Sequence, residues 1–509
     1  MHPDSSTLLD QVRSLCPTCG ENVNAVIFER DGKVYQRPDC SRHPDLQALI
    51  FSDAAFYRKL DQWNQRIFPS SAEAPKSVSC EGTQGQGDFL SVNGPTLAVM
   101  DITNRCNYKC PVCFAEVNEG DQYSLDLEQI SKMLQSLLDR PTPCRNIQFS
   151  GGEPTLHPQF PEIVRKARDL GFKHIQVATN GSRFADYDYV RLCEDAGLHT
   201  LYLQFDGMSD DVYLKLRGQR LLDKKIKIVE NIAKSNMRIV LVPVIASSVN
   251  VDQIGPIFRF ALQHSKHITG ISIQPAALVG RIDLPDQTES FNLATMATEF
   301  GAQTGLTRFP DDWFPLNAVS TITRAMGRLR HDQETNPCCD AHCSLGTFFY
   351  VDDDNKPHCL THFFDLDRFF RGIHDLPARE TQGVLRQQVS RLQELRRFVK
   401  CFDRKKAPRE LTFQRLLRSL DNWEDKSVGR GPGWFRRGFN GMFVAGMHFM
   451  DSRSYNFRRL RRCIIQYVTT DNEVLPFCCY NAGPRFRVEE ETTRLQMRDR
   501  LAGSLATQA

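Results

Sequence analysis

Three cysteines in one short loop carry the most distinctive chemistry in this sequence. Cys106, Cys110 and Cys113 stand in DITNRCNYKCPVCFAE, directly after a predicted strand. At this spacing one loop can place thiolates on three corners of a [4Fe–4S] cluster, and the fourth iron stays open to a substrate or cofactor. The alternatives are a zinc site or three unrelated buried thiols, but the spacing at a strand end favours the cluster.

Polar, glycine-containing segments end the next predicted strands. FSGGEP, residues 149–154, precedes a predicted helix; its glycines let the backbone approach a ligand, and its glutamate can pair with an ammonium group. Two later strands end in ATNG and QFDG. Taken singly, each segment could be an ordinary turn or helix cap, but all are expected at one edge of a parallel sheet. The candidates for ligand contacts are Gly151, Gly152, Glu153, Asn180, Gln204 and Asp206.

A second set of metal-binding residue types lies near the start of the chain. Cys16 and Cys19 belong to CPTCG, Cys40 and His43 belong to CSRH, and the FERDGKVY between them predicts a hairpin. Three cysteines and one histidine on two turns are typical of a zinc site or a mononuclear iron site, since sulfur-rich tetrahedral ligation suits either metal. The alternative is a set of free surface thiols beside an incidental histidine.

Strands and helices alternate through the middle of the chain. The predicted strands are LAVMDI, NIQFS, HIQVAT, TLYLQFD, RIVLVPVIA and GISIQP, with amphipathic segments such as LEQISKMLQSLLD between them. Six such alternations with right-handed crossovers indicate an α/β fold, a partial (β/α)6 TIM-type barrel. Active sites on such sheets lie at the carboxyl ends of the strands, which is where the cysteine loop and the polar segments are expected.

The chain divides into four parts on pattern and composition. Residues 1–66 form a predicted N-terminal metal-binding domain, and residues 67–95, rich in Ser, Gly, Gln and Pro, form a linker. Residues 96–320 form the barrel. Residues 321–509 carry further cysteines without the regular alternation, and we predict a C-terminal domain there.

Composition restricts the classes of partner and location. The chain has 17 cysteines and no predicted secretory signal, so we expect a cytoplasmic protein whose cysteines bind metal. No apolar run approaches the ~20 residues of a membrane-spanning helix. A net charge of +3 without one basic stripe gives no indication of a nucleic-acid partner. The basic residues of 430–462 form either a solvated face or a peripheral contact with anionic headgroups.

The cysteine loop and GGEP together resemble the signature motifs of the radical S-adenosylmethionine (SAM) superfamily. This resemblance implies that SAM binds the open iron and that its one-electron reduction cleaves it to a 5′-deoxyadenosyl radical. It also implies that the GGE segment contacts the amino group of SAM and that an external flavodoxin-type or ferredoxin-type donor supplies electrons. Asn180, Gln204 and Asp206 then become candidates for SAM or substrate contacts.

Within that superfamily the chain resembles the tetraether lipid synthase group. The motifs that carry this resemblance include CPTCG, VPVIASSVN, IQPAALVGRI, MHFMD and RRCIIQYVTTDNEVLPFCCYNAGP. Members of that group also carry a CPxxCGxCxxH stretch before the first barrel strand, whereas this chain keeps only Cys80 there. An N-terminal auxiliary cluster is therefore not expected.

The resemblance also implies an auxiliary [4Fe–4S] cluster in the C-terminal domain. Two cysteine-rich segments there each predict a hairpin with thiols at its ends. We predict Cys339, Cys343, Cys463 and Cys478 as the ligands. The other residues of ligand type in these segments are Cys338, Cys359, Cys479, His342, His358 and His362, and the histidines fit surface or packed positions better.

Three functions follow as hypotheses. The first, implied by the resemblance, is radical formation of carbon–carbon bonds on lipid alkyl chains. The second is radical methylation or other modification of a pterin-like or other heterocyclic small molecule, and the third is a non-catalytic iron–sulfur redox protein. A deep apolar tunnel reaching the cluster would favour the lipid substrate over the heterocycle.

Overall fold

Six parallel strands form the centre of the fold and lie side by side in chain order. The computed structural model describes residues 6–67, 94–117, 122–284, 291–319, 339–374, 396, 399–416, 441–483 and 486–506. The six strands are β5 (Leu97–Thr103), β7 (Asn146–Gly151), β8 (His174–Thr179), β9 (Thr200–Gln204), β10 (Arg238–Val242) and β12 (Ile268–Pro275). The predicted α/β alternation is confirmed.

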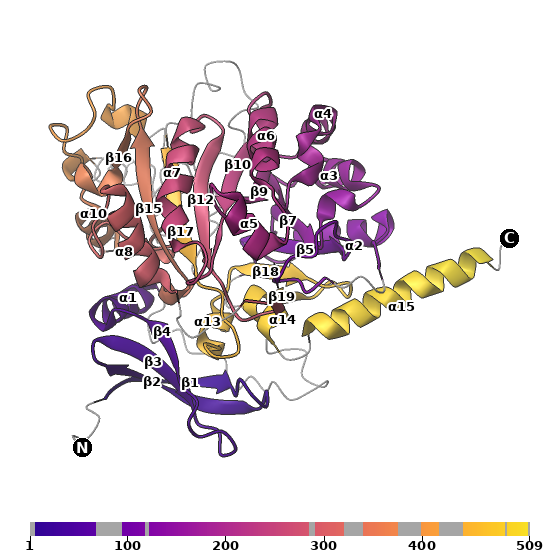
Figure 1. Ribbon diagram of the computed structural model, residues 1–509, viewed down its shortest axis with the longest axis horizontal. Helices are drawn as coiled ribbons and strands as arrows, with labels where there is room; N and C mark the ends of the chain where they lie inside the picture. Colours follow the sequence, from indigo (N-terminus) through magenta and orange to yellow (C-terminus); the bar gives the residue numbers. More distant parts are fainter. Residues whose placement is uncertain are drawn as a thin grey trace, which may run out of the picture.

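Helices connect these strands and pack along the sheet (Figure 1). They are α2 (Leu127–Leu138), α3 (Phe160–Asp169), α4 (Tyr187–Ala196), α5 (Asp210–Arg217), α6 (Leu222–Ile232) and α7 (Ile254–Gln263). The start of α2 shows how sequence sets these boundaries, because the Asp126 side chain accepts a hydrogen bond from the Gln129 N–H as an N-cap. The buried face of α2, with Ile130 and Met133, then packs into the core.

Strands from the C-terminal third extend the same sheet at both edges. β17 (Gly441–Met447) pairs in parallel with β12, and β18 (Ile465–Val468) pairs in parallel with β5. Both predicted hairpins are present: β15 (Ser344–Val351) with β16 (Pro357–Cys359), and β18 with β19 (Val474–Pro476). The predicted barrel and C-terminal segments thus share one sheet, which pairs strand edges that would otherwise be open.

The N-terminal segment forms its own antiparallel sheet, drawn in indigo in Figure 1. Its strands are β1 (Thr7–Leu15), β2 (Asn22–Arg30), β3 (Lys33–Pro38) and β4 (Ala48–Phe51). Asp31 and Gly32, with φ of 52° and 71°, make the tight turn of the predicted hairpin between β2 and β3. The remaining elements are α1 (Ala54–Ile67), β6 (Val112–Cys113), β11 (Val244–Ile245), β13 (Arg281–Ile282), α8 (Leu293–Thr304), β14 (Phe314–Pro315), α10 (Leu366–His374), α13 (Phe457–Arg461), α14 (Phe477–Ala482) and α15 (Phe486–Ala506).

The N-terminal sheet and α1 pack directly against the C-terminal third of the chain. The Gln36 side chain donates to the Tyr455 carbonyl at 2.9 Å, and the Tyr57 ring stacks on the His342 ring at 4.0 Å. Trp63 meets Phe370 edge to face at 5.0 Å. The two ends of the sequence therefore pack together, while most of the predicted linker lies outside the described residues.

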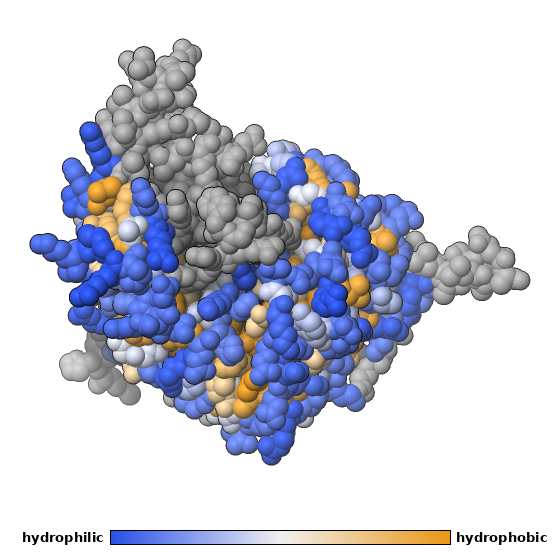
Figure 2. Space-filling model, turned by 90° about the horizontal axis from the view of Figure 1, so that it is seen from above, coloured by the Kyte–Doolittle hydropathy of each residue, from blue (hydrophilic) through white to orange (hydrophobic). Residues whose placement is uncertain are grey.

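Within the described residues, no helix combines the length and the apolar character needed to cross a membrane. On the face seen from above, the coloured atoms are mostly hydrophilic, and the apolar ones gather in small groups (Figure 2). The first part of the basic segment 430–462 lies outside the described residues.

Candidate active site

The three cysteines of the loop after β5 open onto one large cavity. Cys106, Cys110 and Cys113 line this cavity of about 800 Å³, together with Gly151 and Gly152 at the end of β7. Burial raises the pKa of the Cys106 thiol to about 12, so its thiolate needs a neighbouring cation, and cluster iron fits that need. The loop and the polar rim that the sequence predicted separately therefore lie together.

The glycine pair is required by the backbone of the cysteine loop. The Gly152 N–H donates to the Thr103 carbonyl at 2.9 Å, and the Glu153 N–H donates to the Arg105 carbonyl at 2.7 Å. A Cβ on Gly151 would lie 2.1 Å from the Thr103 oxygen, and one on Gly152 would lie 2.4 Å from the Arg105 oxygen. The two glycines therefore let the backbone after β7 lie closely against the backbone of the cysteine loop.

Glu153 is held inside the protein rather than at the cavity surface. Its side chain is fully buried and is not among the described residues that line the cavity. The carboxylate accepts hydrogen bonds from the hydroxyls of Thr155 and Thr179, at 2.5 and 2.7 Å, and from the Asn180 N–H at 2.7 Å. Because these donors come from the ends of β7 and β8, Glu153 fixes one strand end to the other.

Asp206 is likewise buried, and it positions a cation that the sequence did not reveal. Arg217 donates to both carboxylate oxygens, at 2.7 and 2.8 Å, and its third nitrogen donates to the Val112 carbonyl in the cysteine loop at 2.8 Å. Burial alone would raise the pKa of Asp206, but the charge and hydrogen bonds of Arg217 hold it below its ordinary value. Arg217 lines the cavity and lies close enough to the Cys110 thiol to lower its pKa, against the larger effect of burial.

A buried lysine joins the two remaining predicted residues. The Lys225 ammonium donates to the Asn180 carbonyl at 2.7 Å and to the carbonyl and side-chain oxygens of Gln204 at 2.7 and 3.0 Å. Asn180 and Gln204 themselves line the cavity, and their contact with SAM or substrate stays a prediction. Arg217 and Lys225 were missed because an isolated cation in an amphipathic helix has no local pattern that separates it from a surface residue.

Removing the carboxylate of Asp206 should leave Arg217 buried without its counter-charge. We expect Asp206→Ala to lower the free energy of unfolding by about 3–5 kcal/mol, because breaking a buried pair strands the other charge. Changing Arg217 to Met as well should recover part of that loss. Denaturant unfolding measures both variants. Asp169→Ala, which removes an exposed partner of Arg168, is the control and should cost ~1 kcal/mol or less.

The cavity wall formed by the sheet is rich in hydrogen-bonding side chains. Gln176 donates to the Gln148 side chain at 2.6 Å, and Gln274 donates to the Tyr202 hydroxyl at 3.1 Å. All four line the cavity. Another part of the lining is aromatic: the rings of Phe114, Phe449 and Phe477 pack together, with the last two stacked at 4.4 Å.

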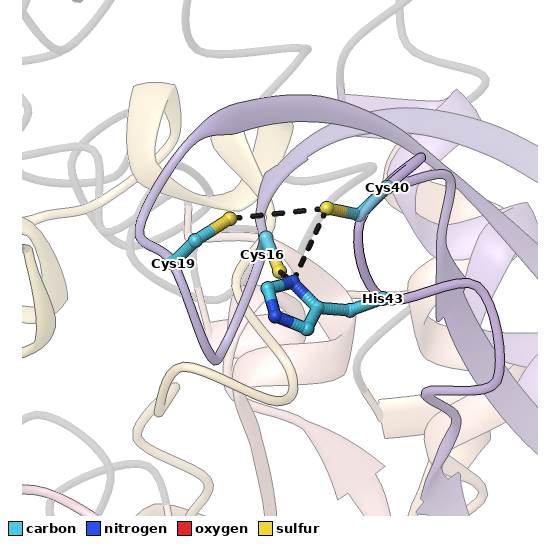
Figure 3. Close-up of side chains that lie close together, drawn as sticks. All are labelled: Cys16, Cys19, Cys40 and His43. Atoms are coloured by element: carbon cyan, nitrogen blue, oxygen red, sulfur yellow. Dashed lines mark hydrogen bonds between the residues drawn. The ribbon is translucent and has the colours of Figure 1, made fainter.

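The four predicted N-terminal ligands converge on one point (Figure 3). Their ligand atoms all lie within 4.8 Å of one another. Cys16 Sγ lies 3.4 Å from His43 Nδ1, and Cys19 Sγ lies 3.8 Å from Cys40 Sγ. Thiolates and an imidazole at these separations fit a single tetrahedral ion.

Loss of one N-terminal ligand should release this ion. We expect Cys16→Ser to cost one equivalent of metal per chain and to lower the Tm, since structural metal binding contributes folding free energy to small domains. Elemental analysis and thermal unfolding measure the two effects. Cys193→Ser changes a buried thiol outside this cluster and should leave the metal content unchanged.

Three of the four predicted C-terminal ligands are electrostatic neighbours. Burial has the largest effect on the pKa of Cys478 and raises it, and the nearby thiols of Cys463 and, to a smaller extent, Cys343 raise it further. The Arg459 guanidinium donates to Cys343 Sγ at 3.4 Å, and the Met450 N–H donates to Cys478 Sγ at 3.3 Å. Cys339, four residues before Cys343 in the sequence, is also buried, and its role as the fourth ligand stays a prediction.

The other residues of ligand type near this group have different partners. His342 is packed under Tyr57 with its ring nitrogen 3.0 Å from Asp340, and His358 pairs with Asp352 at 2.8 Å. Cys80 and Cys338 lie outside the described residues.

Two family models match parts of this chain, and a known protein matches it along nearly its whole length. Residues 100–261 match the Radical SAM superfamily, and residues 8–52 match the HMPTM N-terminal zinc ribbon domain. The 7,8-dihydro-6-hydroxymethylpterin dimethyltransferase of Methanocaldococcus jannaschii is 32% identical over 487 residues, which cover 94% of each protein.

Other matches cover shorter parts of the chain. A probable GTP 3′,8-cyclase of Saccharolobus solfataricus is 34% identical over 28% of this chain and 44% of that protein. The crystal structure of Streptococcus suis SuiB bound to S-adenosylmethionine is 19% identical, with a TM-score of 0.35, over 41% of this chain and 46% of that one. The relative that spans the chain is a pterin dimethyltransferase, so the predicted resemblance to tetraether lipid synthases is not confirmed. The chain belongs to the radical SAM superfamily and, within it, to the family of the 7,8-dihydro-6-hydroxymethylpterin dimethyltransferase.

Proposed function

We propose that this radical SAM enzyme methylates a carbon of a pterin or a closely similar heterocycle. The observation that carries the proposal is the cavity, which joins the three loop cysteines to a polar wall and to a group of aromatic rings. When bound, a [4Fe–4S] cluster at Cys106, Cys110 and Cys113 would supply the electron for SAM cleavage. The partial barrel that we propose for the six parallel strands would enclose the substrate.

The two kinds of cavity wall suit a flat heterocycle. A pterin presents several hydrogen-bonding groups at its edges, and the amides of Gln148, Gln176 and Gln274 offer both donors and acceptors. Its ring faces can stack on aromatic side chains such as Phe449 and Phe477. The lining as a whole is more apolar than polar, and the support for the heterocycle over the lipid substrate comes from the pterin dimethyltransferase that matches along nearly the whole chain.

The remaining metal sites complete the proposal. Cys343, Cys463 and Cys478 would hold an auxiliary [4Fe–4S] cluster, with Cys339 as the fourth predicted ligand. The N-terminal site would hold zinc, in keeping with the zinc ribbon match, and an external flavodoxin-type or ferredoxin-type protein would donate electrons. The chain's own part in the chemistry is to orient SAM and substrate along the cavity and to keep Arg217 beside the cysteine loop.

Mass spectrometry of the products tests this function. The protein with its clusters is incubated anaerobically with a reductant, a reduced 6-hydroxymethylpterin and excess SAM, which serves both as the radical source and as the methyl donor. We expect the pterin to gain the mass of one or more CH2 units, because each methyl group replaces a hydrogen atom. Gln176→Leu should raise KM for the pterin while leaving SAM cleavage without substrate unchanged. An unmodified pterin, together with joined alkyl chains in the lipid extract of an expressing host, would contradict the proposal and support lipid coupling.

A further inference from the structure

A second compact group of metal-binding side chains lies apart from the cysteine sites described above. Asp312 stands between α8 and β14, Cys359 ends β16, and His362 belongs to the 3₁₀ turn Leu360–His362 that follows. Their ligand atoms all lie within 4.8 Å of one another. Among the described residues, only this group and the N-terminal four meet that condition.

The distances and the charge fit a divalent transition metal. His362 Nε2 lies 3.4 Å from Asp312 Oδ2. Two ligands held about 2.1 Å from a tetrahedral Zn²⁺ ion are separated by about 3.4 Å, so these atoms are already at the edge length of such a site. A thiolate and a carboxylate together would balance the charge of the ion, and thiolate with imidazole favours zinc over magnesium or calcium.

Hydrogen bonds around the group hold its members in place. The Thr361 hydroxyl donates to Asp312 Oδ1 at 2.5 Å, the Arg308 N–H donates to Asp312 Oδ2 at 2.7 Å, and the Thr347 hydroxyl lies 3.5 Å from Cys359 Sγ. Such outer partners orient metal ligands. Asp312 and Cys359 are buried, whereas the His362 side chain is 48% exposed, which gives an ion a path from solvent.

We propose that Asp312, Cys359 and His362 bind one Zn²⁺ ion whose fourth position is left to water or to an oxygen atom of a bound molecule. Three protein ligands with one open position are typical of zinc sites that take part in binding or chemistry. Thr347 and Thr361, which contact two of the ligands, line the large cavity. Asp312, Cys359 and His362 do not themselves line the cavity, so the site lies directly behind these two threonines of the cavity wall.

Zinc content of the full-length protein, prepared anaerobically with its clusters, tests the proposal. We expect His362→Gln and Cys359→Ser each to lose one zinc per chain relative to the wild type. His358→Gln is the matched control. His358 lies on the same hairpin and also pairs with an aspartate, Asp352, but it is not one of the three clustered ligand residues. Exchange into Co²⁺ should give a thiolate-to-cobalt absorption band that weakens in both variants and persists in the control.

The variant Cys16→Ser distinguishes the metal of the N-terminal site from the zinc proposed here. Cys16→Ser combined with His362→Gln should lose the sum of what the single variants lose. Equal zinc in the wild type and in His362→Gln would overturn the proposal, and the exposed position of His362 makes that variant safe for folding. If His362→Gln or Cys359→Ser lost iron and sulfide while its zinc content stayed unchanged, the proposal would also be overturned, because these residues would then bind an iron–sulfur cluster.

Discussion

Replacing Cys106, Cys110 and Cys113 together by alanine is expected to reduce reductive cleavage of SAM to the level of a blank without enzyme. These are the three thiols that reach the cavity from the loop after β5, and cysteine thiolates are the ligands that hold iron–sulfur clusters. Without them no iron is available at which SAM could bind and accept an electron. The measurement is 5′-deoxyadenosine formed under anaerobic conditions with a strong reductant.

A matched triple variant separates loss of the cluster from a general effect of losing buried thiols. Cys144, Cys193 and Cys401 are buried outside the metal sites, and their joint change to alanine should leave cleavage close to that of the wild type. Cleavage that persists in the loop variant would overturn the assignment of the cluster. Iron and acid-labile sulfide that remain in the loop variant would come from the auxiliary cluster proposed at Cys343, Cys463 and Cys478, and their complete loss would contradict that cluster.

Adding one methyl group at Gly152 should displace the cysteine loop. Its Cβ would lie 2.4 Å from the Arg105 oxygen and 2.7 Å from the Asn104 oxygen, and both are backbone atoms that cannot turn aside. We expect Gly152→Ala to lower the free energy of unfolding by about 1–3 kcal/mol, as overpacking of a well-filled site does. Iron incorporation should fall with it, because Cys106 directly follows the displaced residues.

The control for this substitution is a glycine with room for a side chain. A Cβ on Gly94 would lie 3.7 Å from its nearest neighbour, so Gly94→Ala should be neutral or slightly stabilising. Denaturant unfolding and iron analysis of the two variants compare the effects directly. Equal stability and iron content in both would show that the Gly152 contact does not set the position of the loop.

Local spacing alone was enough to determine several features of this protein. The loop cysteines, the N-terminal ligands and the six strand–helix alternations are all encoded within short windows. A loop after a strand must keep its residues near that strand's end, and parallel strands must end at the same edge. The convergence of Cys16, Cys19, Cys40 and His43 follows in the same way, since one hairpin joins the two turns.

What each polar side chain contacts was decided only by the tertiary structure. Glu153 and Asp206 were predicted to face a ligand because they follow strands, but the fold turns both inward, where threonine hydroxyls and Arg217 satisfy their charge. Partners that are remote in sequence, such as those brought together by β17 and β18 at opposite edges of the sheet, leave no periodic signal. The polar cavity wall and the meeting of Asp312 with Cys359 and His362 likewise depend on how segments pack, because a contact between distant residues is a property of the assembled core and not of either segment.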